Sequence, residues 1–246
     1  MRRKLISCEI FYREMCAAVA RSLHTVDVNF LPKGLHDIGQ ERMLVRIQHA
    51  IDEVTDSRYE AVLLGYGLCN RGIEGLVARA CPVVIPRAHD CITLFLGSRQ
   101  RYDAYFASHP GTYFLSAGWL ERDEVHPDLK DISIAHRMGM DISYDQMVER
   151  YGQENAQYLH DILGDTLRNY TRFAFVRTGT GYNGMFEQQA RVKSEAHRLP
   201  LEVIEGDSTL IERLINGPWD PETFLIVPPG HRVKVDLDDG IITAEK

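Results

Sequence analysis

Hydrophobic residues along this 246-residue chain fall into short apolar runs that alternate with longer stretches of helical periodicity. Runs of about four to eight apolar residues bounded by Gly, Pro or Asp are typical of buried strands, and apolar residues three and four positions apart are typical of amphipathic helices. In the first half, this pattern predicts strands over residues 4–8, 26–31, 61–64 and 82–85, and helices over residues 11–23, 40–54 and 75–80.

The alternation continues in the second half of the chain. It predicts strands over residues 112–117, 172–177, 201–204 and 224–227, helices over 144–151, 153–169, 185–199 and 209–215, and a small hairpin around 238–240. Strands that alternate with helices favour a parallel sheet with crossover helices. We therefore expect a Rossmann-like α/β fold, either as one doubly wound sheet or as two α/β halves around a cleft, 1–110 and 111–246.

Composition and charge narrow the class of protein. With 44% hydrophobic and 26% charged residues the chain is typical of a globular protein. The 28 basic and 35 acidic residues give a net charge of −7, which disfavours nucleic acid as a partner. No run approaches the ~18 apolar residues that cross a membrane. The apolar stretch at the amino terminus breaks at Glu9, too early for a signal peptide, so we expect a cytoplasmic protein.

Three of the five cysteines follow predicted strands. Cys8, Cys69 and Cys91 each come just after a strand ends, and the carboxyl ends of parallel strands meet at the edge where open α/β folds bind ligands. Thiolates are soft ligands that suit zinc or a [4Fe-4S] cluster with one open iron. The sequence therefore predicts a metal site at this edge, held by three thiols and a fourth group.

Two histidines are candidates for the fourth ligand. His89 lies two residues before Cys91, and His36 follows the second predicted strand. Asp90 or Asp37 is placed to orient an imidazole by accepting a hydrogen bond from the ring nitrogen that does not bind the metal, as carboxylates do at many metal sites.

Four polar residues near these cysteines are candidates for catalysis. His89 and Asp90 would act in acid–base steps, Arg87 would hold an anionic substrate, and Tyr66 would donate a proton or pack its ring. The alternative is that the cysteines are small buried hydrophobes, which is the role expected for Cys16 and Cys81.

A glycine-rich loop in the second half suggests a different site. Gly179, Gly181 and Gly184 satisfy the GxGxxG pattern between a predicted strand and a predicted helix, and Glu205 ends the next strand, where a ribose-binding acid would lie. This predicts a nucleotide such as NAD(P) as cofactor, with a tight strand-to-helix loop as the structural alternative.

Five short segments carry a resemblance to a known family. They are Gly65-Tyr66-Gly67-Leu68-Cys69, Pro86-Arg87-Ala88-His89-Asp90-Cys91-Ile92, Leu96-Gly97-Ser98, Pro110-Gly111-Thr112-Tyr113 and Gly118-Trp119. Together they resemble a bacterial and archaeal family, domain of unknown function sixteen-thirty-eight, over nearly the whole chain to about Gly230. The resemblance implies a single family domain over residues 1–246. It also implies an association with corrinoid-dependent methyltransferase systems, and hence with one-carbon metabolism.

The leading hypothesis is a cytoplasmic metalloprotein, and an enzyme rather than a passive binder. A zinc ion or iron–sulfur cluster on Cys8, Cys69 and Cys91 would serve a transferase, lyase or hydrolase that acts on a small molecule. One alternative is a nucleotide-dependent enzyme that uses the Gly179–Gly184 loop. The other is a non-enzymatic module that senses or delivers a metal or a corrinoid.

Overall fold

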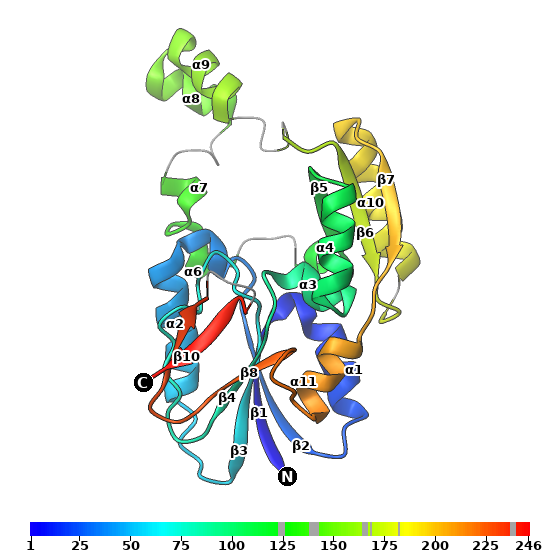
Figure 1. Ribbon diagram of the computed structural model, residues 1–246. Coiled ribbons are helices and arrows are strands. Elements are labelled where there is room, and N and C mark those ends of the chain that lie inside the picture. The colour runs from blue at the N-terminus through cyan, green and yellow to red at the C-terminus, as the bar shows by residue number, and fades with distance from the viewer. Residues whose placement is uncertain (123–125, 138–142, 164–166, 168, 182, 237–239) are drawn as a thin grey trace.

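The computed structural model describes residues 1–246 except 123–125, 138–142, 164–166, 168, 182 and 237–239 (Figure 1). The first sheet has the order β2-β1-β3-β4-β8. Its strands are β1 (Arg2–Cys8), β2 (Thr25–Leu31), β3 (Tyr59–Gly65), β4 (Val83–Pro86) and β8 (Phe224–Val227). All pairs are parallel except β4 with β8. Because the chain moves from β1 outward to β2 and then back past β1 to β3, the winding reverses between β1 and β3.

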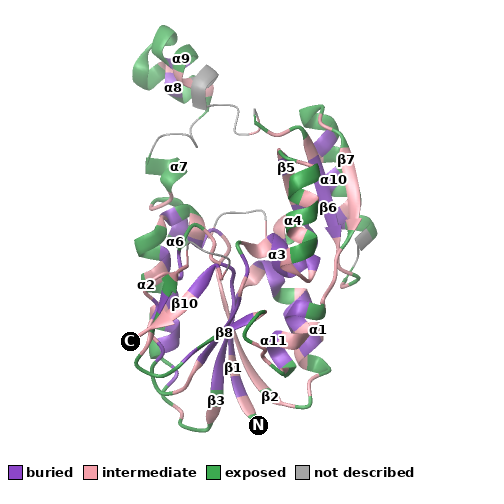
Figure 2. Ribbon diagram, in the orientation of Figure 1, coloured by how far each residue is buried: buried purple, intermediate pink, exposed green. Residues whose placement is uncertain are grey.

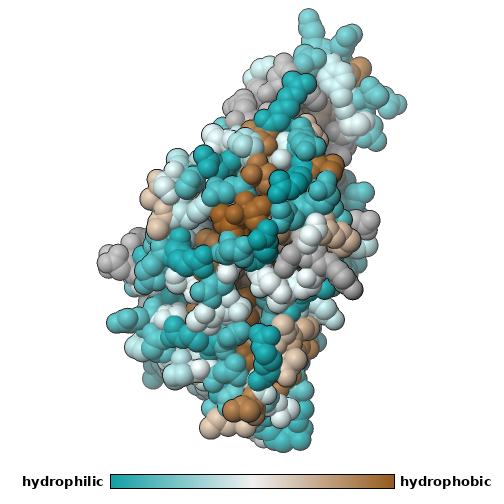
Figure 3. Space-filling view, turned by 90° about the vertical axis from the view of Figure 1, so that its right-hand side faces the viewer, coloured by the Kyte–Doolittle hydropathy of each residue, from teal (hydrophilic) through white to brown (hydrophobic). Residues whose placement is uncertain are grey.

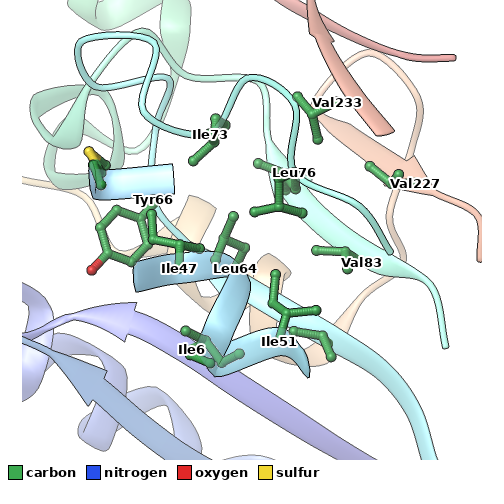
Figure 4. Close-up of a cluster of buried hydrophobic side chains, with 14 of the residues drawn as sticks. Ile6, Ile47, Ile51, Leu64, Tyr66, Ile73, Leu76, Val83, Val227 and Val233 are labelled. Carbon is green, nitrogen blue, oxygen red and sulfur yellow. The ribbon is translucent and has the colours of Figure 1, made fainter. Parts of the chain in front are cut away.

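Side chains that alternate along these strands fill two separate cores. Ile6, Leu64 and Val83 face α2 (Gln40–Asp52), whereas their neighbours Leu5, Leu63 and Val84 face the opposite layer. That layer contains α1 (Tyr12–Ala20), α3 (Cys91–Leu96) and α11 (Thr209–Asn216). Figure 4 shows the cluster on the α2 side. Each fully buried Leu or Ile contributes about 1.5–3 kcal/mol, so alternation along the strands builds a three-layer α/β half.

A second, three-stranded parallel sheet forms the other half. Its order is β5 (Thr112–Ser116), β6 (Arg172–Arg177) and β7 (Leu201–Glu205). Phe173 and Phe175 pack against α10 (Asn183–His197), and on the other face α4 (Arg99–Ser108) places Tyr105 5.5 Å from the ring of Phe114. The α/β fold is confirmed, and the strands form two sheets rather than one continuous sheet.

The carboxyl ends of the two sheets face one another (Figure 1). The short helix η1 (Glu9–Phe11), which follows β1, contacts α5 (Ala117–Glu121), which follows β5. Gly118 makes this contact possible, because a Cβ at that position would lie 1.7 Å from the carbonyl oxygen of Ile10. Figure 2 shows that the buried residues concentrate in the central strands β1, β3 and β6. The loops after these strands therefore meet between the halves.

The remaining elements connect the sheets or extend from them. They are η2 (Leu35–Ile38), α6 (Pro127–Lys130), α7 (Ile134–Arg137), α8 (Tyr144–Tyr151), α9 (Gln153–Leu163), β9 (Arg232–Val235) and β10 (Ile242–Glu245). Helices α8 and α9 pack on each other and stand away from both sheets (Figure 1). Strands β9 and β10 pair antiparallel, as predicted for the tail, while residues 238 and 239 of the expected turn lie outside the described residues.

The helices of the structure differ from the predictions in three places. Residues 75–80 form an irregular segment with an isolated bridge between Val77 and Arg232, because Gly75 and Ala78 donate backbone hydrogen bonds to Val233 and His231. Helices α3 and α4 were not expected, since α3 is buried on nearly all sides and α4 buries no residue, so neither shows an amphipathic pattern. The predicted helix over 153–169 ends at Leu163, and residues 164–166 and 168 lie outside the described chain.

The described helices include none long and apolar enough to span a membrane. The side of the molecule in Figure 3 is mostly hydrophilic, with hydrophobic side chains gathered near its middle. Scattered exposed apolar residues are normal for a protein surface.

Candidate functional site

A small cavity lies where the winding of the first sheet reverses, at the carboxyl ends of β1 and β3. Its volume is about 30 Å³. The residues on its wall with polar or thiol groups are Cys8, Lys33, His36, Tyr66, Cys69, Cys91 and Trp119, and the rest of the wall is apolar apart from Gly67. Ligands of open α/β folds bind at such reversal points. The structure thus brings three cysteines from three separate segments of the chain to one cavity.

The local backbone explains how each thiol reaches the cavity. Cys8 ends β1 and occupies the N-cap position of η1, without a side-chain cap hydrogen bond. Cys91 is the first residue of α3. Cys69 lies in the loop after β3, where its N–H donates to the carbonyl of His89 at 3.0 Å.

Two backbone features fix the loop that carries Cys69. Gly67 lies against the backbone of Asp90, where a Cβ would come within 2.8 Å. Cys69, Asn70 and Arg71 have φ of 37°, 54° and 59°, in the left-handed region that side chains rarely adopt. Backbone strain of this kind persists only where the surrounding structure stabilises it, and it is common at functional sites.

The environment of the thiols disfavours negative charge when no cation is bound. Burial raises the pKa of Cys8 and of Cys69 to about 12, and that of Cys91 well above its ordinary value. The charge of each neighbouring thiolate raises the pKa of Cys69 and Cys91 further. The N–H groups of Ile10 and Gly67 partly offset these effects at Cys8 and Cys69. A bound cation would reverse this balance, because thiolates are the form that binds metal.

The three thiols line the same cavity, but they lie farther apart than the ligands of a single metal ion do. Among the residues that the structure describes, no three His, Cys, Asp or Glu side chains lie close enough together to hold a metal ion. No disulfide joins the described cysteines, since all five are free. Metal binding would therefore require the three side chains to turn inward as they lose their protons.

Tyr66 lies beside these thiols and is only 3% exposed. Its ring packs in the core on the α2 side, and its hydroxyl points away from the aliphatic side chains (Figure 4). That hydroxyl has no hydrogen-bond partner of acceptable geometry among the described residues. Burial raises the pKa of Tyr66, and the nearby Cys8 and Cys69 raise it further. Tyr66 is therefore a neutral donor aimed at the thiols.

Lys33, His36 and Trp119 form another part of the wall. The Lys33 ammonium lies 4.8 Å from the centre of the Trp119 ring and donates to the carbonyl of Arg122 at 2.7 Å. The His36 ring lies 5.8 Å from that of Trp119, and its Nε2 is 3.1 Å from Asp37 Oδ1. Because Trp119 belongs to α5, the second half of the molecule helps to enclose the cavity.

The sequence had not suggested Lys33 or Trp119 for this site. Trp119 follows the strand β5, so the same strand-end rule that selected the cysteines could have selected it. Lys33 lies just after the end of β2, so the same rule could have selected it as well.

The structure places three candidate residues of the 87–90 segment outside the wall of this cavity. His89 is exposed and does not line the cavity; Ala88 is buried, and the next side chain of this extended segment points to solvent. Asp90 is a helix cap, since Oδ1 accepts from the N–H of Ile92 and Oδ2 from the hydroxyl of Tyr102. His36 is therefore the histidine that shares the cavity with the thiols.

Arg87 also has a structural role. Its guanidinium donates to the carbonyl oxygens of Pro221, Gly240 and Ile242, and so ties the carboxyl-terminal strands to the first sheet. It does not line the cavity. Its role in holding an anionic substrate stays a prediction.

The glycine loop lies between β6 and α10, as predicted, but it packs against the first half. The hydroxyls of Thr178 and Thr180 donate to Oε1 of the buried Glu14 at 2.6 and 2.8 Å. The negative charge of Glu14 next to this loop would repel a phosphate group bound there.

The other residues of this predicted nucleotide site have separate places. Gly179 and Gly181 have φ of 74° and 85°, which a tight strand-to-helix loop requires. Gly184 lies in the first turn of α10, and Glu205 forms an ion pair with Arg177 at 2.6 Å. The arrangement therefore favours the structural alternative over a dinucleotide site.

Comparison with known proteins identifies the family. The family model DUF1638, described as a protein of unknown function, matches residues 30–215. The chain belongs to the DUF1638 family. The resemblance predicted from the five segments is thus confirmed, over a shorter range than expected. The matched range contains every polar residue of the cavity wall except Cys8. No curated protein and no solved structure matches this DUF1638 protein.

Proposed function

We propose that this DUF1638 protein is a metal-dependent enzyme in which Cys8, Cys69 and Cys91 bind one zinc ion and leave a fourth position to a small-molecule substrate. The observation that carries the proposal is that thiols from three separate segments of the chain line a single cavity at the reversal point of the sheet. Three thiolates with an open fourth position form a donor set suited to catalytic zinc.

An iron–sulfur cluster on the same three thiols is the alternative that the experiment must distinguish.

The charges around the cavity also fit thiolate-bound zinc. Three thiolates and Zn²⁺ together carry a single negative charge, and the Lys33 ammonium already lowers the pKa of Cys8. His36, held by Asp37, lines the same wall and is placed to bind the metal or to accept a proton. Reduced thiols of this kind fit the cytoplasmic location that we propose.

The bound zinc would supply Lewis acidity, which lowers the pKa of a coordinated thiol or water. The methyltransferase association that the family resemblance implies favours a thiol substrate. In such a methyl transfer His36 or water would take the proton of the thiol substrate, Cys8, Cys69 and Cys91 would hold the zinc, and a methylated corrinoid would be the methyl donor.

Metal analysis of the anaerobically purified protein tests the proposal. We expect about one zinc per chain in the wild type, and less than a tenth of that in Cys8→Ser, Cys69→Ser and Cys91→Ser. Cys16→Ser and Cys81→Ser are matched controls, because these cysteines do not line the cavity, and they should retain the metal.

Two other results would contradict the zinc assignment. A brown protein that absorbs near about 400 nm would indicate an iron–sulfur cluster on the same thiols. A wild type that fails to retain added zinc, or that loses it equally in all five variants, would exclude the proposed site.

A further inference from the structure

Two buried hydrogen-bond donors beside the cavity have no acceptor. They are the hydroxyl of Tyr66 and the indole Nε1 of Trp119, and neither has a partner of acceptable geometry in the described chain. Buried donors without partners are rare, because the lost hydrogen bond to water is not replaced. Both residues line the cavity, and they come from opposite halves of the molecule.

Each donor has a thiol as a neighbour. Tyr66 lies against the thiol of Cys8, and Trp119 against that of Cys91, on the wall of the same cavity. A neutral thiol is a weak acceptor, whereas an anionic sulfur accepts strongly. The two donors therefore lack good partners only as long as the thiols keep their protons.

We propose that Tyr66 Oη and Trp119 Nε1 donate hydrogen bonds to the metal-bound sulfurs of Cys8 and Cys91, and so fix the charge and orientation of two ligands. This inference rests on the proposed function. Both are positioning residues, of the kind that commonly surrounds metal ligands.

Trp119 belongs to α5 of the second half, and so it connects the proposed metal site with the contact between the two halves. Helix α5 reaches the cavity because Gly118 lies against Ile10, and the Lys33 ammonium donates to the carbonyl of Trp119 at 3.4 Å. A hydrogen bond from Trp119 to a metal ligand adds to these contacts. Metal binding in the first half should therefore hold the second half more firmly in place.

Cobalt(II) titration of the full chain tests the inference without any assay of activity. Removing a donor from a thiolate raises the energy of its electrons, so Tyr66→Phe and Trp119→Phe should move the sulfur-to-cobalt absorption band to longer wavelength. In competition with a chelator, each variant should bind cobalt about tenfold more weakly.

The chain offers matched controls for both substitutions. The hydroxyl of Tyr59 donates to Asp27, and the indole of Trp219 donates to the carbonyl of Leu214, both away from the cavity. Tyr59→Phe and Trp219→Phe should leave the band and the affinity unchanged.

The outcomes separate this inference from the proposed function. If the wild type binds cobalt but neither cavity variant changes the band or the affinity, the inference is wrong and the metal site stands. If the wild type binds no cobalt, both fall. If Trp119→Phe does not fold, Tyr66→Phe, which keeps the ring in the core, decides the question alone.

Discussion

The loops at the carboxyl ends of the two sheets look equally suited to ligands in the sequence, yet the structure treats them differently. In the first sheet, three thiols and two unsatisfied donors face a cavity. In the second sheet, the threonine hydroxyls of the glycine loop donate to Oε1 of Glu14, whose Oε2 has no partner in the described chain, and Glu205 is paired with Arg177. The comparison shows that a position at a strand end allows a ligand site, while side chains that converge on one cavity indicate one.

The largest expected effect concerns the contact that closes the cavity. Gly118→Ala would place a Cβ 1.7 Å from the carbonyl oxygen of Ile10, so α5 must shift. We expect a loss of about 3 kcal/mol in the free energy of unfolding, together with weaker zinc binding. Gly184→Ala, in the first turn of α10, is the matched control, because nothing lies within 4 Å of its added Cβ. Urea unfolding of both variants measures the difference, and equal losses would contradict the described contact.

Bound zinc should stabilise the folded protein only through the cavity that Cys8, Cys69 and Cys91 line. At a free zinc concentration of about 100 times Kd, we expect a gain of about 2.7 kcal/mol in the free energy of unfolding. Cys91→Ser should abolish this gain, and Glu14→Ala should retain it. Thermal melts with zinc and with chelator report the shift. A gain that persists in Cys91→Ser would place the metal elsewhere.

The buried carboxylate under the glycine loop should have a smaller, purely structural effect. Glu14→Ala leaves the hydroxyls of Thr178 and Thr180 without their acceptor, so we expect a loss of about 2 kcal/mol in the free energy of unfolding. Zinc content should stay at the wild-type level. A loss of zinc in this variant would show that the two regions are coupled rather than separate.

The smallest effects are expected for the predicted nucleotide site. Glu205→Gln removes one exposed ion pair with Arg177, and such pairs contribute little to stability. The melting temperature should not change measurably, and NAD(P) or ATP should shift neither the wild type nor this variant. A ligand-induced shift that depends on Glu205 would restore the nucleotide hypothesis.

Much of this protein follows from its sequence. The alternation of apolar runs with helical periods predicts the α/β fold and all eight strands of the two main sheets to within about two residues. Helices such as α3 and α4 escape the pattern because one is buried nearly all round and the other buries no side chain. The irregular structure of residues 75–80 was missed because its backbone hydrogen bonds go to His231 and Val233, far away in the chain.

For the site, the sequence by itself determined that Cys8, Cys69 and Cys91 follow strands and so belong at one edge of a parallel sheet. Only the tertiary structure decided which other groups join them. It turned His89 to solvent, made Asp90 a helix cap and brought Lys33 and Trp119 to the cavity. The physical reason is that strand order follows from local periodicity, whereas the direction of a loop side chain depends on contacts with segments distant in sequence.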